Sequence, residues 1–172
     1  NSIAIVNNLF PNVKIIQNLK NEGYAKGYNN ALKHIDADVF CLLNSDVEVT
    51  SNWLTPILLE YKNNISTDII QPKILDFKNK SLFEYAGAGG GFIDKYGYAY
   101  CRGRIFETIE KDMSQYNDTA SVFWASGACF FIKKSTFKAL NGFDDTYFAH
   151  FEEIDLCWRA FNAGYTTTYV GT

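Results

Sequence analysis

The chain has 172 residues and a mass of 19.5 kDa, which is the size of one ordinary domain. Apolar residues make up 47% and charged residues 20%, so the chain can bury a core and wholesale disorder is excluded. A net charge of −3 gives no bulk attraction for a phosphate backbone, so nucleic acid is not an expected partner. Because no apolar run approaches the roughly 18 residues that span a bilayer, any membrane contact is expected to be peripheral.

Hydrophobic spacing in the first half of the chain predicts helices that alternate with strands. In chain order we expect a helix at 3–9, a strand at 13–17, a helix from the glycines near 23 to His34, a strand at 39–43, a helix beginning at Ser51 or Thr55, and a strand at 69–75. Residues 76–121 are rich in Gly and Tyr, which favours short strands and loops over the main sheet. Because loops on a rigid sheet often carry specificity, this segment is expected to select a binding partner.

The second half continues the same alternation. An apolar stretch at 122–132 is interrupted by small residues at 126–128, and it is followed by helices at 135–140 and 152–162 and a strand at 166–170. This order predicts an α/β fold with a mainly parallel central sheet flanked by helices. We expect a single domain that spans residues 1–172.

The segment Asn44-Ser45-Asp46-Val47-Glu48 directly follows the apolar run at 39–43, which is typical of a central parallel strand. Open α/β sheets bind ligands at the carboxyl ends of their strands, so this segment is a candidate site. Asp46 and Glu48 could share one hard cation, such as Mg²⁺ or Mn²⁺, with a substrate phosphate. The alternative is a solvated turn that Asp46 only caps.

Three acids, Glu152, Glu153 and Asp155, stand at the expected start of a helix, where the helix dipole favours negative charge. Asp155 and Arg159 are four residues apart and can pair on one helix face. Glu152 lies near that face, whereas Glu153 is rotated about 100° away and could point into a cleft as a general base. The alternative is an acidic cluster that only stabilises the helix.

A third candidate is the segment 21–30, where two glycines, Gly23 and Gly27, allow a close backbone approach. Lys26 adds a positive charge, and the amides at a helix start can contact a phosphate. The segment matches neither a Walker A loop nor G-x-G-x-x-G. An ordinary glycine-rich turn between a strand and a helix is therefore at least as good an interpretation.

Together and in this order, these segments resemble the family-2 glycosyltransferases, most closely their bacterial rhamnosyltransferase-like branch. The matching blocks are Asn21-x-Gly23-Tyr24-Ala25-x-Gly27-x-Asn29, Leu42-Leu43-Asn44-Ser45-Asp46-Val47-Glu48-Val49, Ser126-Gly127-Ala128, Gly142-Phe143-Asp144 and Phe151-Glu152-Glu153-x-Asp155-Leu156-Cys157-x-Arg159. The resemblance covers nearly the whole chain and implies a GT-A fold, a Rossmann-like sheet that binds a nucleotide-sugar. It also implies inverting transfer, in which a carboxylate deprotonates the acceptor hydroxyl and a divalent cation neutralises the departing diphosphate.

The resemblance also implies roles for individual residues. Asp46 matches the metal-binding Asp of the family's D-x-D motif, and Asn44 replaces the first Asp, which contacts the ribose or donor sugar. Glu48 contacts the metal or one of the residues that hold it. Glu153 matches the second acid of the E-D motif, the expected base, and is one methylene longer than the usual Asp. The remaining residues expected at the donor site or in the donor and acceptor pocket are Asn21, Gly23, Lys26, Ser126, Gly127 and Glu152.

Two differences from the family imply a catalytic domain truncated at both ends. Family members begin with a strand that grips the nucleotide base, whereas this sequence starts within the helix that follows. Many members also supply a metal-binding His just after the strand that corresponds to 166–170. We therefore expect this chain to bind a nucleotide-sugar weakly and a longer chain to bind it normally.

The expected reaction transfers a sugar from a UDP- or dTDP-linked donor to a glycan or lipid-linked acceptor, in bacterial surface polysaccharide synthesis. The expected location is the cytoplasm, at the inner face of the plasma membrane where lipid-linked acceptors lie. An alternative from another class is a non-catalytic module that binds a nucleotide-sugar or glycan on the same fold. A sugar-phosphate nucleotidyltransferase is a weaker alternative, because no glycine-rich, basic nucleotide loop occurs early in the chain.

Overall fold

The computed structural model of the chain describes residues 2–172. Its helices and strands, in chain order, are α1 (Ser2–Leu9), α2 (Gly23–Leu32), β1 (Val39–Leu43), α3 (Leu54–Asn63), β2 (Thr67–Pro72), β3 (Gly91–Ile93), β4 (Ala99–Cys101), β5 (Arg104–Ile105), β6 (Thr108–Ile109), β7 (Thr119–Val122), β8 (Cys129–Lys133), α4 (Lys134–Ala139), α5 (Glu152–Asn162) and β9 (Thr166–Val170). Apart from the strand at 13–17, each predicted element is confirmed to within a few residues at its ends. None of the described helices is both long and apolar enough to cross a membrane.

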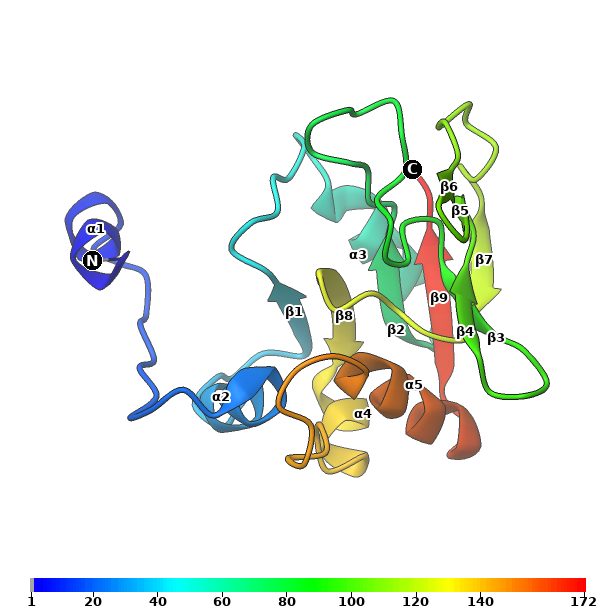
Figure 1. The fold of residues 1–172 in the computed structure, drawn as a ribbon. Helices are drawn as coiled ribbons and strands as arrows, with labels where there is room; N and C mark the ends of the chain where they lie inside the picture. Colours follow the sequence, from blue (N-terminus) through cyan, green and yellow to red (C-terminus); the bar gives the residue numbers. More distant parts are fainter. Residues whose placement is uncertain (1) are drawn as a thin grey trace.

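The centre of the fold is a five-stranded sheet in the order β1-β8-β2-β9-β7 (Figure 1). The predicted α/β fold, with helices around a central sheet, is confirmed. The expectation of a mainly parallel sheet is wrong, because β8 lies antiparallel between β1 and β2 and β7 lies antiparallel to β9. Only β2 and β9 pair in parallel in the described sheet. An apolar run signals burial on both faces of a strand and does not encode the strand's direction.

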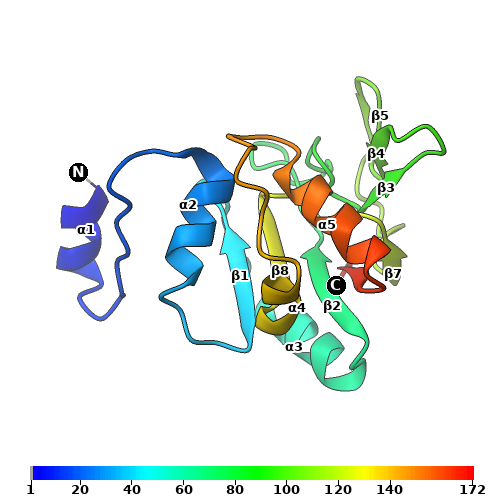
Figure 2. The same cartoon turned by 90° about the horizontal axis from the view of Figure 1, so that it is seen from below.

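Helices cover both faces of this sheet, with α5 and α3 on opposite sides (Figure 2). On the α5 side, Phe130 and Ile132 of β8 pack with residues of α2, α4 and α5. On the α3 side, Phe131 of the same strand packs with Ile57. Successive side chains of a strand point to opposite faces, so β8 is apolar throughout because both faces are covered.

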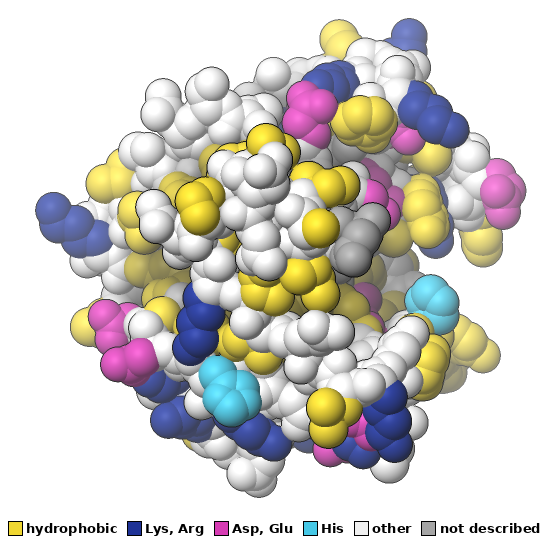
Figure 3. Space-filling model, turned by 90° about the vertical axis from the view of Figure 1, so that its left-hand side faces the viewer, with side chains coloured by type: hydrophobic (Ala, Val, Ile, Leu, Met, Phe, Trp, Pro, Cys, Tyr) yellow, Lys and Arg dark blue, Asp and Glu magenta, His cyan; other side chains and the backbone are white. Residues whose placement is uncertain are grey.

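The N-terminal segment contrasts with this core. Helix α1 confirms the prediction for residues 3–9, but it has no buried residue and stands apart from the sheet (Figure 1). The predicted strand at 13–17 is wrong, because within the described chain these residues are extended without pairing to any strand. Their β-branched side chains have β propensity, which needs a neighbouring strand to take effect. Apolar side chains such as Leu9 and Phe10 are exposed, and apolar side chains gather on the face that carries α1 (Figure 3).

Residues 73–121 form the short strands and loops that the sequence predicts. Two small hairpins, β3–β4 and β5–β6, lie beside the sheet. A third turn, which we call the 74–84 hairpin, follows β2 and contains one bridge, between Leu75 and Phe83. The Phe83 side chain is fully buried, so this hairpin is anchored to the body of the molecule.

Candidate active site

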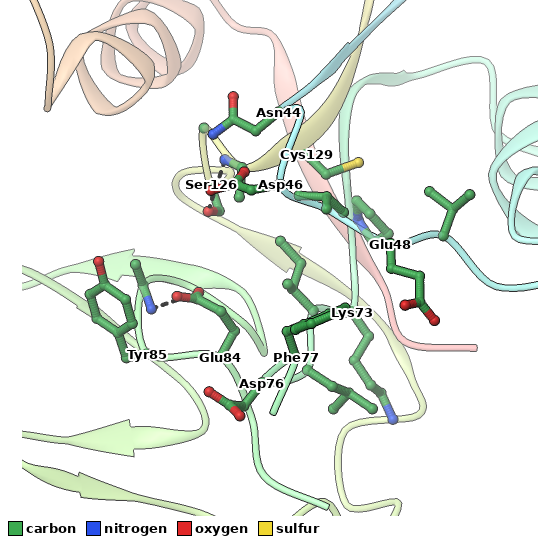
Figure 4. Close-up of a pocket in the computed structure, with 18 of the residues that line it drawn as sticks. Asn44, Asp46, Glu48, Lys73, Asp76, Phe77, Glu84, Tyr85, Ser126 and Cys129 are labelled. Atoms are coloured by element: carbon green, nitrogen blue, oxygen red, sulfur yellow. Dashed lines mark hydrogen bonds between the residues drawn. The ribbon is translucent and has the colours of Figure 1, made fainter. Parts of the chain in front are cut away.

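A cavity of about 650 Å³ lies where β1 ends and β8 begins. Its volume falls within the range of roughly 300–1,000 Å³ that is usual for small-molecule sites. Most of its lining comes from the loop after β1, the turn before β8, the start of α5 and the 74–84 hairpin. Figure 4 labels residues of the two loops beside β1 and β8 and of the hairpin. Tyr24 of α2, Ile57 of α3 and Thr172 also line the cavity. The carboxyl end of β1 is thus at a cavity, as the sequence predicts.

The loop after β1 brings Asn44, Asp46 and Glu48 to the cavity. The amide of Asn44 donates to the carbonyl of Ala128 at 3.0 Å, which fixes the loop to the turn before β8. Asp46 is exposed in the cavity, whereas the Glu48 carboxylate forms an ion pair with Lys80 at 2.7 Å. Asp46 and Glu48 extend in different directions (Figure 4). Glu48 would have to leave Lys80 to join Asp46 at a shared cation.

The described residues offer a divalent cation only part of a coordination shell. Among residues 2–172, no group of three His, Cys, Asp or Glu side chains is arranged to hold a metal ion. Asp46 provides one carboxylate inside the cavity. Because Mg²⁺ is usually held by one or two carboxylates plus substrate phosphates, this arrangement fits a cation that a phosphate-bearing ligand helps to hold.

The start of α5 places two glutamates in the same cavity. His150 and Phe151 just before it have φ angles of 71° and 67°, the left-handed region that non-glycine residues seldom adopt. Glu152 is only 4% exposed, and Oε2 of both Glu152 and Glu153 is buried without a hydrogen-bond partner among the described residues. Burial of an unpaired carboxylate oxygen is costly, so this arrangement is more typical of a functional site than of a structural one.

The surroundings of Glu153 favour its protonated form. Burial raises the pKa of this carboxyl above its ordinary value, and the nearby charge of Glu152 raises it further. The backbone of Gly127 and the charge of His150 act on the pKa in the opposite direction. A Cβ placed on Gly127 would lie 3.5 Å from Cδ of Glu153, so the carboxyl rests against this turn. A carboxylate with a raised pKa is a better general base near neutral pH.

Ser126 and Gly127, both at the cavity, are held by residues that sequence reasoning missed. The buried side chain of Gln71 accepts a hydrogen bond from the amide of Ser126 at 2.8 Å. The hydroxyl of Tyr24 donates to the carbonyl of Gly127 at 2.9 Å. Tyr24 stands in the block around Gly23, but the motif gives no sign that its hydroxyl fixes a turn so far along the chain.

The three predicted donor-site residues near the start of α2 do not line the cavity. Asn21 accepts a hydrogen bond from the amide of Gly23 at 3.0 Å, and Lys26 pairs with Glu22 at 3.0 Å. Gly23 has φ +86°, and a Cβ there would lie 2.1 Å from the carbonyl oxygen of Phe148. A close approach between α2 and the loop before α5 therefore explains the glycine, and donor contact by these three residues stays a prediction.

The predicted pair on α5 is confirmed. The guanidinium of Arg159 donates to the Asp155 carboxylate at 2.8 Å and to the carbonyls of Leu140 and Gly142 at 2.7 and 2.9 Å. These bonds fix α5 to the segment that follows α4. Asp155 thus has a structural partner, whereas Glu153 on the same helix faces the cavity.

The 74–84 hairpin forms a wall of the cavity and overlaps the segment 76–121, which is expected from the sequence to select a binding partner, with no individual residue assigned. Its residues Asp76, Phe77 and Glu84, with Tyr85 next to it, line the cavity opposite Asn44 and Asp46 (Figure 4). Burial raises the pKa of the Glu84 carboxyl above its ordinary value. The segment has neither a motif nor a regular hydrophobic period, so no pattern in the sequence singles these residues out.

Comparisons with known proteins identify the family and the fold of the chain. The model of the family described as Glycosyl transferase family 2 matches residues 1–140. The rhamnosyltransferase WbbL of Escherichia coli K12 is 35% identical over 91 residues, which cover 53% of this chain and 34% of that protein. The N-acetylglucosaminyl-diphospho-decaprenol L-rhamnosyltransferase of Mycobacterium tuberculosis is 41% identical over 49 residues, or 28% of this chain and 16% of that protein.

Among solved structures, the chain is similar to GalNAc-T7, which was crystallised with UDP, GalNAc and Mn²⁺. The TM-score is 0.69 at 14% sequence identity, and the match covers 98% of this chain and 33% of that one. At this identity the likeness shows the fold, which is the GT-A fold of that enzyme. Both this match and the match to the E. coli protein span about a third of the longer protein.

Proposed function

Because the chain belongs to glycosyl transferase family 2, we propose that it carries the catalytic site for inverting transfer of a sugar from a nucleotide-diphosphate-sugar to an acceptor hydroxyl. The observation that carries the proposal is that Asp46 and Glu153, far apart in the sequence, line one cavity. A UDP- or dTDP-linked sugar is the donor. Asn44, Asp46, Ser126 and Gly127 form the part of the cavity that receives it.

Glu153 is the general base in this proposal. It takes the proton of the acceptor hydroxyl as that oxygen bonds to the anomeric carbon, and the bond from this carbon to the diphosphate oxygen breaks on the opposite face. The configuration at the anomeric carbon is therefore inverted. Two observations support the assignment: the unpartnered Oε2 of Glu153 and the raised pKa of its carboxyl.

The charge of the cavity supports the use of a divalent cation, Mg²⁺ or Mn²⁺. The lining contains more carboxylates than ammonium groups, and both of its lysines, Lys73 and Lys80, are paired with acids. A diphosphate would be repelled there unless a cation neutralised it. Asp46 is the residue that would hold this cation, which supplies charge neutralisation for the departing diphosphate. The similar structure of GalNAc-T7 was determined with Mn²⁺ and UDP.

The names of the relatives, which include two rhamnosyltransferases and a hexosyltransferase of glycan biosynthesis, support a rhamnosyl or hexosyl donor and a lipid-linked or glycan acceptor. The mycobacterial relative is named for rhamnosyl transfer to N-acetylglucosaminyl-diphospho-decaprenol, a lipid-linked sugar. On this basis the protein acts in bacterial surface polysaccharide synthesis, at the cytoplasmic face of the plasma membrane.

A donor screen with the full-length protein tests the proposal. dTDP-rhamnose, UDP-glucose and UDP-N-acetylglucosamine are incubated with octyl N-acetylglucosaminide and Mn²⁺, and mass spectrometry detects the glycosylated product. We expect one donor to give a product whose new linkage has the opposite anomeric configuration from the donor. Absence of both donor binding by calorimetry and product formation would contradict the proposal, and a retained configuration would contradict the role of Glu153.

A further inference from the structure

We propose that the 74–84 hairpin is the acceptor side of the cavity, where Glu84 and Tyr85 bind an uncharged, hydroxyl-rich sugar ring. This inference rests on the proposed function and names the substrate class of the same site.

The hairpin holds its side chains in fixed directions. The amide of Glu84 donates to the carbonyl of Ile74 at 3.1 Å, and the amide of Asp76 donates to the carbonyl of Leu82 at 3.0 Å. Between these bonds Phe83 points into the core, where it is fully buried. Because successive residues of an extended arm face opposite sides, Glu84 faces away from the core and toward the cavity that it lines.

Glu84 and Tyr85 offer the two kinds of contact that bind a sugar ring, a hydrogen-bond acceptor for its hydroxyls and an aromatic surface for its apolar face. Oε2 of Glu84 accepts a hydrogen bond from the amide of Ala86 at 2.7 Å, which orients the carboxylate. A carboxylate has about four acceptor positions, so sugar hydroxyls can still donate to it. Tyr85 is 62% exposed and lines the cavity, so its ring can cover the apolar face of a sugar. The guanidinium of Arg104 lies 5.9 Å from the centre of that ring.

Charge and position identify the occupant as a neutral acceptor. Asp76 and Glu84 stand on the same wall, so a sugar ring that carried a carboxylate would be repelled. The residues proposed for the donor, Asn44 and Asp46, lie on the other side of the cavity (Figure 4). A ring bound at the hairpin would present a hydroxyl to the space between the walls, which Glu153 also lines.

The test compares acceptor kinetics in the full-length protein with octyl glycosides of N-acetylglucosamine and glucuronic acid, at saturating donor and Mn²⁺. Loss of a hydrogen bond to a charged group predicts that Glu84→Gln raises the acceptor KM about tenfold, with the donor KM unchanged within twofold. Tyr85→Ala is expected to raise the acceptor KM similarly, and Tyr85→Phe to restore it. Glu107→Gln, a change at an exposed glutamate outside the cavity lining, is the matched control.

Saturation-transfer NMR with the same octyl glycosides measures acceptor binding without turnover. In one outcome the wild-type protein binds the neutral glycoside but transfers no sugar to it. If Glu84→Gln then weakens this binding, the proposed function fails while the subsite stands. The subsite is overturned if a folded Glu84→Gln variant keeps its acceptor KM and affinity, if the donor KM changes instead, or if the glucuronide is the preferred acceptor.

Discussion

The two walls of the cavity both present carboxylates, but they bury them to different degrees. On the α5 wall, Glu152 is almost completely buried, and one oxygen of each glutamate has no partner within residues 2–172. On the hairpin wall, Asp76 and Glu84 are only partly buried, and Glu84 is oriented by a backbone amide. Burial raises the pKa of both Glu153 and Glu84, but only Glu153 has a buried oxygen without a partner among the described residues, which suits proton transfer. The Glu84 carboxylate is oriented by the amide of Ala86, which suits binding. The hydrogen-bond partners of the carboxylate thus distinguish two roles for one type of side chain.

The largest expected effect comes from removing the base on the α5 wall. Glu153→Gln keeps the shape of the side chain but cannot accept a proton, so kcat is expected to fall by about 10²–10⁴-fold. Donor affinity, measured by calorimetry, should stay within about threefold of the wild-type value. Retained turnover would remove Glu153 from the role of base.

The next largest effect is expected for changes in the loop after β1, which carries Asp46 and Glu48. Asp46→Asn removes the one cavity carboxylate that we assign to a cation, so kcat/KM is expected to fall about 10–100-fold, as for loss of a group that orients a metal. The apparent affinity for Mn²⁺, from a titration of activity, should fall in parallel. Glu48→Gln, which breaks only the exposed pair with Lys80, is expected to change either quantity by less than about threefold. Equal losses in both variants would show that the two acids act together.

A smaller effect is expected on the pH profile. The base must be deprotonated, so kcat/KM should fall as the pH decreases through the raised pKa of Glu153. Glu152→Gln removes the negative charge that helps to raise this pKa, so the acidic limb should move to lower pH. A profile measured with Glu107→Gln is the control and should not move. An unmoved limb in Glu152→Gln would contradict the electrostatic coupling of the two glutamates.

The smallest effect is on stability. The pKa of Glu153 is raised in the folded state, so the folded protein binds the carboxyl proton more tightly than the unfolded chain does. The charged carboxylate therefore lowers the free energy of unfolding only at pH values above its ordinary pKa of about 4.5. Glu153→Gln should therefore raise the melting temperature by about 2–4 °C at pH 7, which is roughly 1 kcal/mol for a chain of this size. The gain should shrink near pH 4, where Glu153 is protonated in both states. A lower melting temperature of Glu153→Gln at pH 7 would contradict the interpretation that the Glu153 carboxylate is buried without a partner.

Much of this arrangement could be predicted from the sequence, and the failures have physical causes. The apolar run of β1 and the acids at the start of α5 are local patterns, and they led to Asp46 and Glu153. The direction of β8 depends on the path of the chain between strands, which no local pattern encodes. Glu84 and Tyr85 reach the cavity only because a hairpin without regular periodicity is anchored by one buried phenylalanine. The segment at 13–17 has strand composition but lacks the neighbouring strand that would make it one.

Gly23 shows how the backbone outside the cavity sets its geometry. A side chain there would collide with the carbonyl of Phe148, the same oxygen that accepts the amide of Tyr24 at 2.8 Å. The first turn of α2 and the segment leading to Glu152 are therefore coupled, so that a shift of one displaces the other. A single methyl group added at Gly23 would displace the acidic end of α5, although Gly23 itself does not line the cavity. Loss of turnover after such a change would reflect misalignment at long range, and the chemistry of the pocket itself would be intact.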